Sequence, residues 1–241
     1  YIVNTSPASN EGNTTIKVTG TLTTASNYIY PSSDKTYVEK RIYTDRNTYL
    51  TEIQYYDGLG RPDQLVKSKF SPEGGDLVSV QEYDGYGRPS ESWLPAPIYK
   101  NNSKYMENAQ VAGQARNIYG DTKPYSSSEY EQSPLKKVLK QYGPGKDWHD
   151  NNKGVSADYK TNVSGNTTFN CYLYKVSGTN QNPTLTNPGN YATGKFNVTE
   201  VRDAGGHISY EFKDKLRRSI LSRQVSQNIH TETYHIYKDR R

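Results

Sequence analysis

The sequence predicts an all-β fold made of antiparallel hairpins, and a repeated turn motif is the main reason. Seven residues, 56–62 (YDGLGRP), return 27 residues later as 83–89 (YDGYGRP). Asp can hydrogen-bond its own backbone two residues on, and Gly accepts a positive φ without strain, so each copy is typical of a tight turn. Runs rich in β-branched and aromatic residues flank the first copy, at 50–56 and 64–70. We expect these hairpins to form one extended, twisted or curved sheet or an open half-barrel, with one short helix packed on it.

The composition favours partly exposed sheets over a compact aliphatic core. Leu, Ile, Val and Phe together make up only 41 of the 241 residues, whereas Tyr alone accounts for 23. Such a low aliphatic content is associated with disorder when net charge is high, but the net charge here is only +5. A tyrosine ring can bury roughly 150–250 Å² while its hydroxyl stays hydrated. We therefore expect an ordered β protein whose sheets are half exposed.

Charge and cysteine usage argue against several classes of protein. Lys and Arg number 30 against 25 Asp and Glu, and no helix-turn-helix, zinc or RNA-sheet signature accompanies this mild excess. We therefore expect no nucleic-acid partner. A single cysteine, Cys171, excludes an internal disulfide framework and is expected to be a structural thiol. No stretch approaches the ~20 apolar residues of a transmembrane helix.

The N-terminal part contains the sharpest β signals. Residues 1–27, rich in Ser, Thr and Asn, predict a flexible segment with one edge strand at 14–19. Residues 28–95 predict the hairpin sheet. Its strands are expected at 28–31, 37–43, 50–56, 63–70, 76–83 and 90–95. In both repeats Pro directly follows Arg, and because Pro cannot donate to a ladder it should begin the outgoing strand.

Residues 96–150 predict an insertion of loop and short helix. The helix is expected from about 104 to 117, where Ala109, Ala112 and Arg116 fall at helical spacing. Gly113 lies inside it and costs about 1 kcal/mol against Ala. Residues 133–142 could begin a helix at Pro134, but the following Gly-Pro-Gly stop favours a strand.

Residues 151–241 predict a second β segment with degenerate repeats, continuous with 28–95 in one domain. Strands are expected at 166–176, 195–202 and 207–212, with a hairpin turn at 203–206. Residues 210–218 place an aromatic residue, an acid and an arginine in the order of the sharp repeats, and 219–225 is the outgoing strand. Tyr237 follows Phe212 by 25 residues, where another turn would begin. We expect the chain to be a fragment of a longer repeat protein, with unpaired edge strands that could form a dimer.

These residues carry a family resemblance. The Tyr-Asp-Gly-x-Gly-Arg turns resemble the YD repeats of the bacterial Rhs (rearrangement hotspot) family. The wider pattern is similar to the uncharacterised N-terminal domain of Rhs-type cell-surface proteins, on the matching segments 56–62, 82–95, 131–135, 143–148 and 210–218. The resemblance implies a large secreted or surface-exposed protein whose hairpins wall off a cavity, often around a C-terminal toxin. Its partners would be the rest of that polypeptide or the toxin passenger, and any leader is absent from this chain.

The repeated turns are expected to be structural and not catalytic, because active sites do not usually recur at a fixed period. The turn residues are Tyr56, Asp57, Gly58, Gly60 and Arg61, with Tyr83, Asp84, Gly85, Gly87 and Arg88 as their counterparts. His230 and His235 are five apart, so on one strand they point to opposite faces and do not share a metal. We predict no catalytic residue, no metal site and no cofactor.

The expected function is therefore a non-enzymatic structural module, with two alternatives. A carbohydrate-binding module would use exposed Tyr and Trp side chains, and Trp93 and Trp148 are the candidate glycan-binding residues because both lie beside Pro or Gly loops. A hydrolase is the more remote alternative. It would require His149 or His207 to meet an acid in a concave pocket.

Overall fold

A computed structural model of the chain describes residues 2–5, 29, 31–46, 48–179, 181–226 and 229–237. It confirms an all-β protein of antiparallel strands with short helices. The chain forms two compact units. The first contains residues 1–128 and 143–150, and the second contains 129–142 and 151–241.

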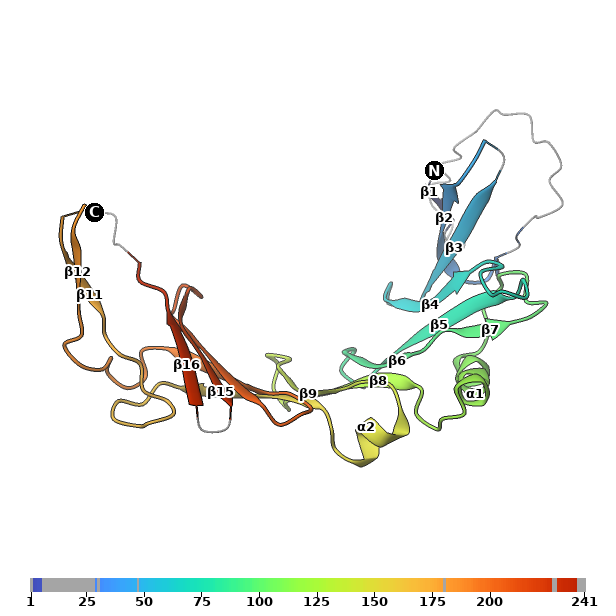
Figure 1. Ribbon diagram of the computed structural model, residues 1–241. Coiled ribbons are helices and arrows are strands. Elements are labelled where there is room, and N and C mark those ends of the chain that lie inside the picture. The colour runs from blue at the N-terminus through green and yellow to red at the C-terminus, as the bar shows by residue number, and fades with distance from the viewer. Residues whose placement is uncertain are drawn as a thin grey trace. The chain divides into compact units, whose positions relative to one another are not determined.

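The first unit is a sheet whose neighbouring strands follow one another along the chain (Figure 1). Every pair is antiparallel, and β7 adds to the far end of β5. The strands are β1 (Ile2–Thr5), β2 (Thr36–Tyr43), β3 (Tyr49–Tyr56), β4 (Pro62–Lys67), β5 (Asp76–Tyr83), β6 (Pro89–Trp93), β7 (Ala96–Ile98) and β8 (Tyr125–Tyr130). The ladder slips by one residue where β3 meets β4 and where β5 meets β6, directly beside the two sharp repeats.

One face of this sheet is covered by α1 (Asn108–Tyr119). Alternate residues of the central strands point to this face, and Ile53, Val66 and Val78 are fully buried there. The helix contributes small buried side chains, Val111, Ala112 and Ala115, so it can lie close to the strands. It ends at Gly120, whose φ of +59° is the left-handed conformation that closes many helices.

The helix begins later than the expected residue 104 because the preceding segment is hydrogen-bonded to the sheet. Buried Gln64 accepts from the Met106 N–H (3.1 Å) and donates to the Met106 carbonyl (2.8 Å). The buried Asp76 carboxylate accepts from the Ser103 N–H (2.6 Å). The bond to the Met106 carbonyl occupies an acceptor that an earlier helical turn would need. A second, one-turn helix, α2 (Lys146–Asp150), was not expected.

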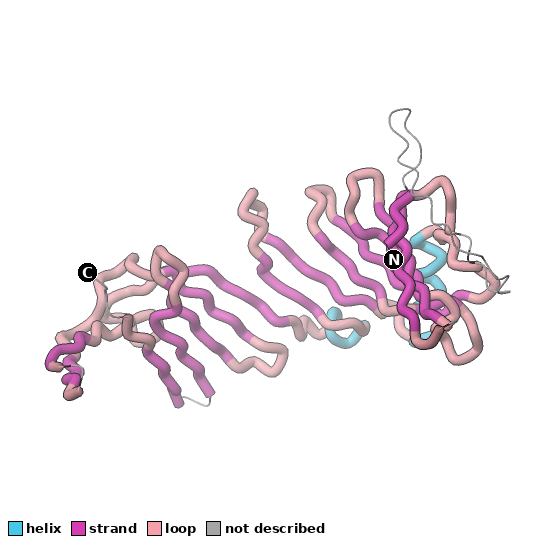
Figure 2. Tube along the Cα trace, turned by 90° about the horizontal axis from the view of Figure 1, so that it is seen from above, coloured by secondary structure: helices cyan, strands magenta, loops and turns pink. Residues whose placement is uncertain are grey.

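The second unit is again an antiparallel sheet, in which the later strands lie side by side in chain order (Figure 2). Its strands are β9 (Val138–Tyr142), β10 (Val155–Thr161), β13 (Asn197–Arg202), β14 (Ile208–Lys213), β15 (Ser219–Ser226) and β16 (Ile229–Tyr234). A separate pair, β11 (Lys175–Gly178) and β12 (Pro183–Thr186), belongs to the long connection between β10 and β13.

A buried arginine fastens this long connection to the sheet. Arg223 on β15 is only 1% exposed, and its Nε donates to Glu232 Oε1 on β16 (2.7 Å). Its other nitrogens donate to the backbone carbonyls of Thr168 and Asn170 and to the Asn170 side chain. The core beneath contains Phe212, Leu221 and fully buried Cys171. A buried charge held this completely orients the loop because any displacement would leave it unpaired.

Several expected elements need correction. Most of the range expected as a strand at 166–176 is not one: it begins with a turn, because the Asn166 side chain accepts the N–H groups of Thr168 and Phe169 (both 2.8 Å) and competes with ladder formation, and only its last two residues belong to a strand, β11. Only the second half of the strand expected at 133–142 forms, as β9. The insertion expected from residue 96, of loop and short helix, begins with the strand β7. The edge strand expected at 14–19 and two of the four residues of the strand expected at 28–31 lie outside the described residues.

Candidate functional site in the Asp-anchored turns

Asp57 organises the first sharp repeat by holding the whole turn from its first residue. Its backbone N–H donates to the Arg61 carbonyl (3.0 Å), and its carbonyl accepts from the Gly60 N–H (3.0 Å). Oδ1 accepts from the N–H groups of Leu59 and Arg61 (both 2.9 Å). Oδ2 accepts from the Arg61 guanidinium (2.7 Å). Gly60 has φ +74°, which places a glycine where an L-residue would be strained.

The same arrangement occurs four times in the described residues, and we call each an Asp-anchored turn. In every case the aspartate backbone bonds the residue four places on, and Oδ1 and Oδ2 bond that residue's N–H and side chain. The four turns are 57–61, 84–88, 203–207 and 214–218. In the third turn His207 replaces arginine, with its Nδ1 2.9 Å from Asp203 Oδ2. In the fourth, Arg217 takes the glycine position at φ +62°.

The turn carboxylates are held in the charged form. Burial would raise the pKa of Asp57, but the Arg61 N–H and guanidinium outweigh it, so its pKa lies below the ordinary value. Hydrogen bonding by Arg88 lowers the pKa of Asp84, chiefly through the backbone N–H. The His207 side chain likewise lowers the pKa of Asp203. An acid already bonded to its own backbone is poorly suited to exchange protons with a substrate.

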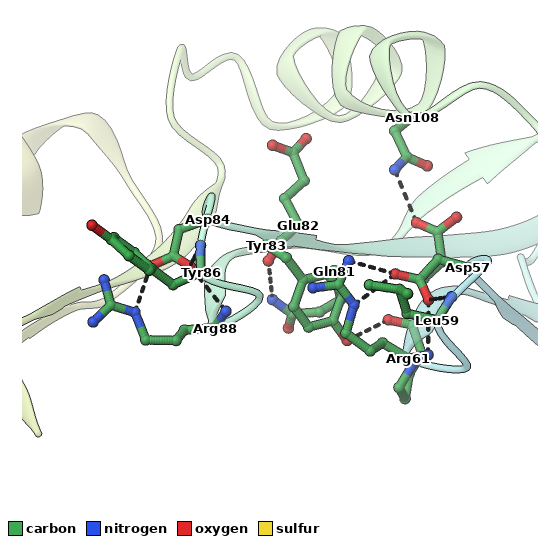
Figure 3. Close-up of polar contacts among 12 residues, drawn as sticks. Asp57, Leu59, Arg61, Gln81, Glu82, Tyr83, Asp84, Tyr86, Arg88 and Asn108 are labelled. Atoms are coloured by element: carbon green, nitrogen blue, oxygen red, sulfur yellow. Dashed lines mark hydrogen bonds and ion pairs between the residues drawn. The ribbon is translucent and has the colours of Figure 1, made fainter. Parts of the chain in front are cut away.

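Successive hairpins are linked by an arginine–tyrosine contact that we call the clasp. The Arg61 guanidinium lies 4.2 Å from the centre of the Tyr83 ring, which begins the next repeat, and the Tyr83 hydroxyl donates to the Pro62 carbonyl (2.6 Å). Figure 3 shows these two turns with Arg61 beside Tyr83 and Arg88 bonded to Asp84. A Cβ on Gly87 would lie 2.7 Å from an Arg61 nitrogen, so the second turn needs glycine there for contact with the first.

The clasp recurs in the second unit. The Arg218 guanidinium lies 4.7 Å from the centre of the Tyr237 ring, and the Tyr237 hydroxyl donates to the Ser219 carbonyl (3.0 Å). Ser219 directly follows Arg218, just as Pro62 directly follows Arg61. Tyr237 therefore occupies the place that Tyr83 has in the first unit.

Sequence reasoning missed one member of the repeat, a glutamine three residues before each sharp aspartate. Gln54 Nε2 donates to the carbonyls of Tyr55 (2.9 Å) and Gln64 (3.2 Å). Gln81 Nε2 donates in the same way to the carbonyls of Glu82 (2.8 Å) and Glu91 (3.0 Å). Both amides sit where the ladder slips, so they satisfy carbonyls that the irregular pairing leaves over. The shared spacing Gln-x-x-Asp was the available signal.

The two candidate glycan-binding tryptophans lie in very different surroundings. Trp93 is 5% exposed in the core of the first unit, with the Arg116 guanidinium 4.7 Å from its ring centre and the Tyr125 ring centre 4.7 Å away. A buried indole is not available to stack on a sugar. Trp148 is 44% exposed on α2. No other aromatic ring contacts it among the ring pairs of the described residues.

Of the two histidines that a hydrolase could use, His207 meets an acid, and Asp203 and His207 both line a cavity of about 350 Å³ in the second unit. His149 Nε2 lies 3.1 Å from the Tyr125 carbonyl, in the first unit, whereas His207 belongs to an Asp-anchored turn of the second. Asp150 is bonded by Lys123 (2.8 Å) and Lys146 (2.5 Å), which lower its pKa to about 2.

Metal binding, thiol chemistry and membrane spanning were also considered for the described residues. No cluster of three or more His, Cys, Asp or Glu suited to a metal ion occurs there. Burial raises the pKa of the Cys171 thiol to about 12, which keeps it protonated. No helix of the described part is long and apolar enough to cross a bilayer.

Comparison with known families places the chain in one of them. The family model described as "Domain of unknown function (DUF6443)" matches residues 26–161, more than half of the chain. The chain belongs to the DUF6443 family. The matched region includes both sharp repeats and the clasp that joins them. No curated protein and no solved structure matches the chain.

Proposed function

We propose that this DUF6443 chain is a non-enzymatic structural module of an Rhs/YD-repeat protein that is secreted or exposed on a bacterial surface. Its hairpins would form part of a β-sheet shell, or present a surface to the rest of the polypeptide or to a toxin passenger. The observation that carries the proposal is the recurrence of the Asp-anchored turn. In each of the four described copies the aspartate carboxylate is bonded both to the turn backbone and to the side chain four residues on.

The clasp supports a structural role for the turns over a catalytic one. Arg61 binds Asp57 within its own turn and stacks on Tyr83 of the next, so each hairpin braces its neighbour along one sheet edge. A sheet of repeated hairpins can be lengthened by adding further hairpins without changing the existing core, since each repeat contacts chiefly its neighbours. This suits a wall and gives no reason for a reaction centre.

The proposal is tested with the full native polypeptide on intact bacteria. A membrane-impermeant amine reagent should label this chain as strongly on intact cells as after lysis, while a cytosolic protein is labelled only after lysis. Equal protection of this chain and the cytosolic protein from the reagent on intact cells would contradict the surface location.

The structural role is tested by proteolysis. Protease should cut the polypeptide beyond this chain more readily when Arg61→Ala and Arg218→Ala remove both clasps, and Lys40→Ala serves as a matched surface control. An unchanged digestion pattern would contradict the structural role.

A further inference from the structure

A small tyrosine-rich pocket in the second unit lies beside the clasp that Arg218 and Tyr237 form. Its volume is about 210 Å³. Five tyrosines from three separate chain segments line it: Tyr172, Tyr174, Tyr191, Tyr234 and Tyr237. A concentration of one amphipathic residue type around one cavity is unusual for a surface that serves only as a wall, because each ring brings an apolar face and a polar hydroxyl.

The pocket is held open by backbone bonds and does not depend on the tyrosine hydroxyls alone. The Leu173 N–H donates to the Gly189 carbonyl (2.8 Å), and the Tyr191 N–H donates to the Cys171 carbonyl (2.9 Å). On the opposite side, the His235 N–H donates to the Ile220 carbonyl (2.9 Å). These bonds fix the segments that carry the rings, so the site is preformed.

The rings are arranged at angles to one another, and two of the hydroxyls already have partners: that of Tyr234 accepts from the Tyr172 N–H (3.4 Å) and that of Tyr237 donates to the Ser219 carbonyl (3.0 Å). The Tyr174 and Tyr234 rings meet edge to face at 4.7 Å, and the Tyr172 ring lies 6.5 Å from each of them. Tyr172 is 37% exposed and Tyr237 is 44% exposed, so the mouth is open to solvent.

The charge of the lining selects among ligands that aromatic rings can bind. An aromatic cage can hold a quaternary ammonium ion. Here, however, the Arg218 guanidinium, whose Nε is bonded to Asp214 Oδ2 (2.7 Å), lines the pocket and lies against the Tyr237 ring, where it would disfavour a bound cation. None of the described lining residues carries a carboxylate. This combination favours a neutral or anionic ligand.

We propose that the pocket binds a single sugar ring that carries a carboxylate, such as a uronic acid unit of a glycan. A sugar ring has an apolar C–H face that can stack on tyrosine and a rim of hydroxyls that can bond tyrosine hydroxyls. The cavity is smaller than the roughly 300–1,000 Å³ of sites for drug-sized ligands, which restricts it to one ring. The carboxylate would face the Arg218 and His235 side of the opening. The site shares Arg218 and Tyr237 with the clasp, but a wall can exist with or without a bound sugar.

The test uses saturation-transfer NMR on the whole chain with methyl glucuronide, methyl glucoside and choline as probes. Tryptophan fluorescence is unsuitable because both tryptophans lie in the other unit. We expect transfer to both sugars, tighter binding of the glucuronide, and no competition by choline. Transfer to choline alone, transfer to neither sugar, or equal affinity for the two sugars would overturn the proposal.

Variants locate the binding. Tyr174→Ala and the rim variant Tyr237→Ala should each weaken glucuronide binding about tenfold, which corresponds to about 1.4 kcal/mol. Tyr86→Ala removes a tyrosine that is 74% exposed in the first unit and should leave binding unchanged. Thermal melting identifies any variant that does not fold, and the exposed Tyr237 keeps the test available if Tyr174→Ala fails. Sugar affinity that survives both pocket variants would contradict the assignment, without bearing on the turns.

Discussion

At the scale of single residues, one aspartate fixes five residues of backbone in each turn. A shorter or uncharged side chain could not satisfy two N–H groups with one oxygen and a cation with the other. Charge-assisted bonds of this kind are stronger than neutral ones. The turn aspartates are therefore expected to matter for stability and to make that stability sensitive to acid.

We expect Asp57→Asn to cost about 1 kcal/mol at neutral pH, because the amide keeps a carbonyl acceptor for the turn N–H groups but loses the ion pair with Arg61. The pKa of Asp57 in the folded chain lies below its ordinary value of 3.8. The stabilisation is therefore fully present above that value and is lost as pH falls through the folded-state pKa. Thermal melting between pH 7 and pH 2 should show a smaller loss of Tm in the variant than in the wild type. Parallel pH profiles would contradict this.

At the scale of the element, the glycines of the two sharp hairpins are not equivalent. Gly60 and Gly87 both have positive φ, but a Cβ at Gly60 meets open space whereas one at Gly87 meets Arg61. Gly85 has neither constraint. Glycine is thus needed at Gly60 for the backbone conformation alone, and at Gly87 for both that conformation and the contact between hairpins.

Three alanine substitutions separate these effects. Gly60→Ala should cost about 1 kcal/mol from backbone strain alone. Gly87→Ala should cost about 2 kcal/mol because it also displaces Arg61 from Tyr83, and Gly85→Ala should change stability by less than about 0.5 kcal/mol. Denaturant unfolding measures all three. A cost at Gly87 no greater than at Gly60 would mean that the contact between the turns contributes nothing.

At the scale of the whole molecule, the two units have separate buried clusters that share no residue. The chain supplies a natural probe for each. Both tryptophans belong to the first unit, and the only cysteine, Cys171, is buried in the second. Tryptophan fluorescence and thiol labelling therefore report on different cores of one chain.

We expect Arg223→Met to lower the stability of the second unit by about 3 kcal/mol, because Glu232 and several loop carbonyls lose their partner. Thiol labelling of Cys171 should then occur at lower denaturant, while the tryptophan transition stays in place. Arg202→Met, at an exposed arginine of the same unit, should move neither curve. A shift of both curves by the same amount in Arg223→Met would show that the chain unfolds as one cooperative body.

The sequence predicted the fold class and the sharp turns because their signals are local. Asp57 and Asp84 are each followed by glycines at fixed spacing, and that pattern depends on nothing distant. The bonding of buried Arg223 to the loop was not predictable, since its loop partners lie 53 to 56 residues away and an arginine in a strand is usually exposed. Trp93 was misleading for a similar reason, because its neighbouring prolines suggested a surface loop while α1 covers it from elsewhere in the chain.

The account depends most on the clasp, so the most direct measurement is a double-mutant cycle on Arg61→Gln and Tyr83→Leu. Unfolding free energies of the wild type, both single variants and the double variant are measured by tryptophan fluorescence. The control cycle pairs Arg61→Gln with Tyr49→Leu, at the opposite end of β3. We expect a favourable coupling of about 0.5–1 kcal/mol between Arg61 and Tyr83 and none between Arg61 and Tyr49. Strictly additive effects at Arg61 and Tyr83 would contradict the claim that successive hairpins brace one another.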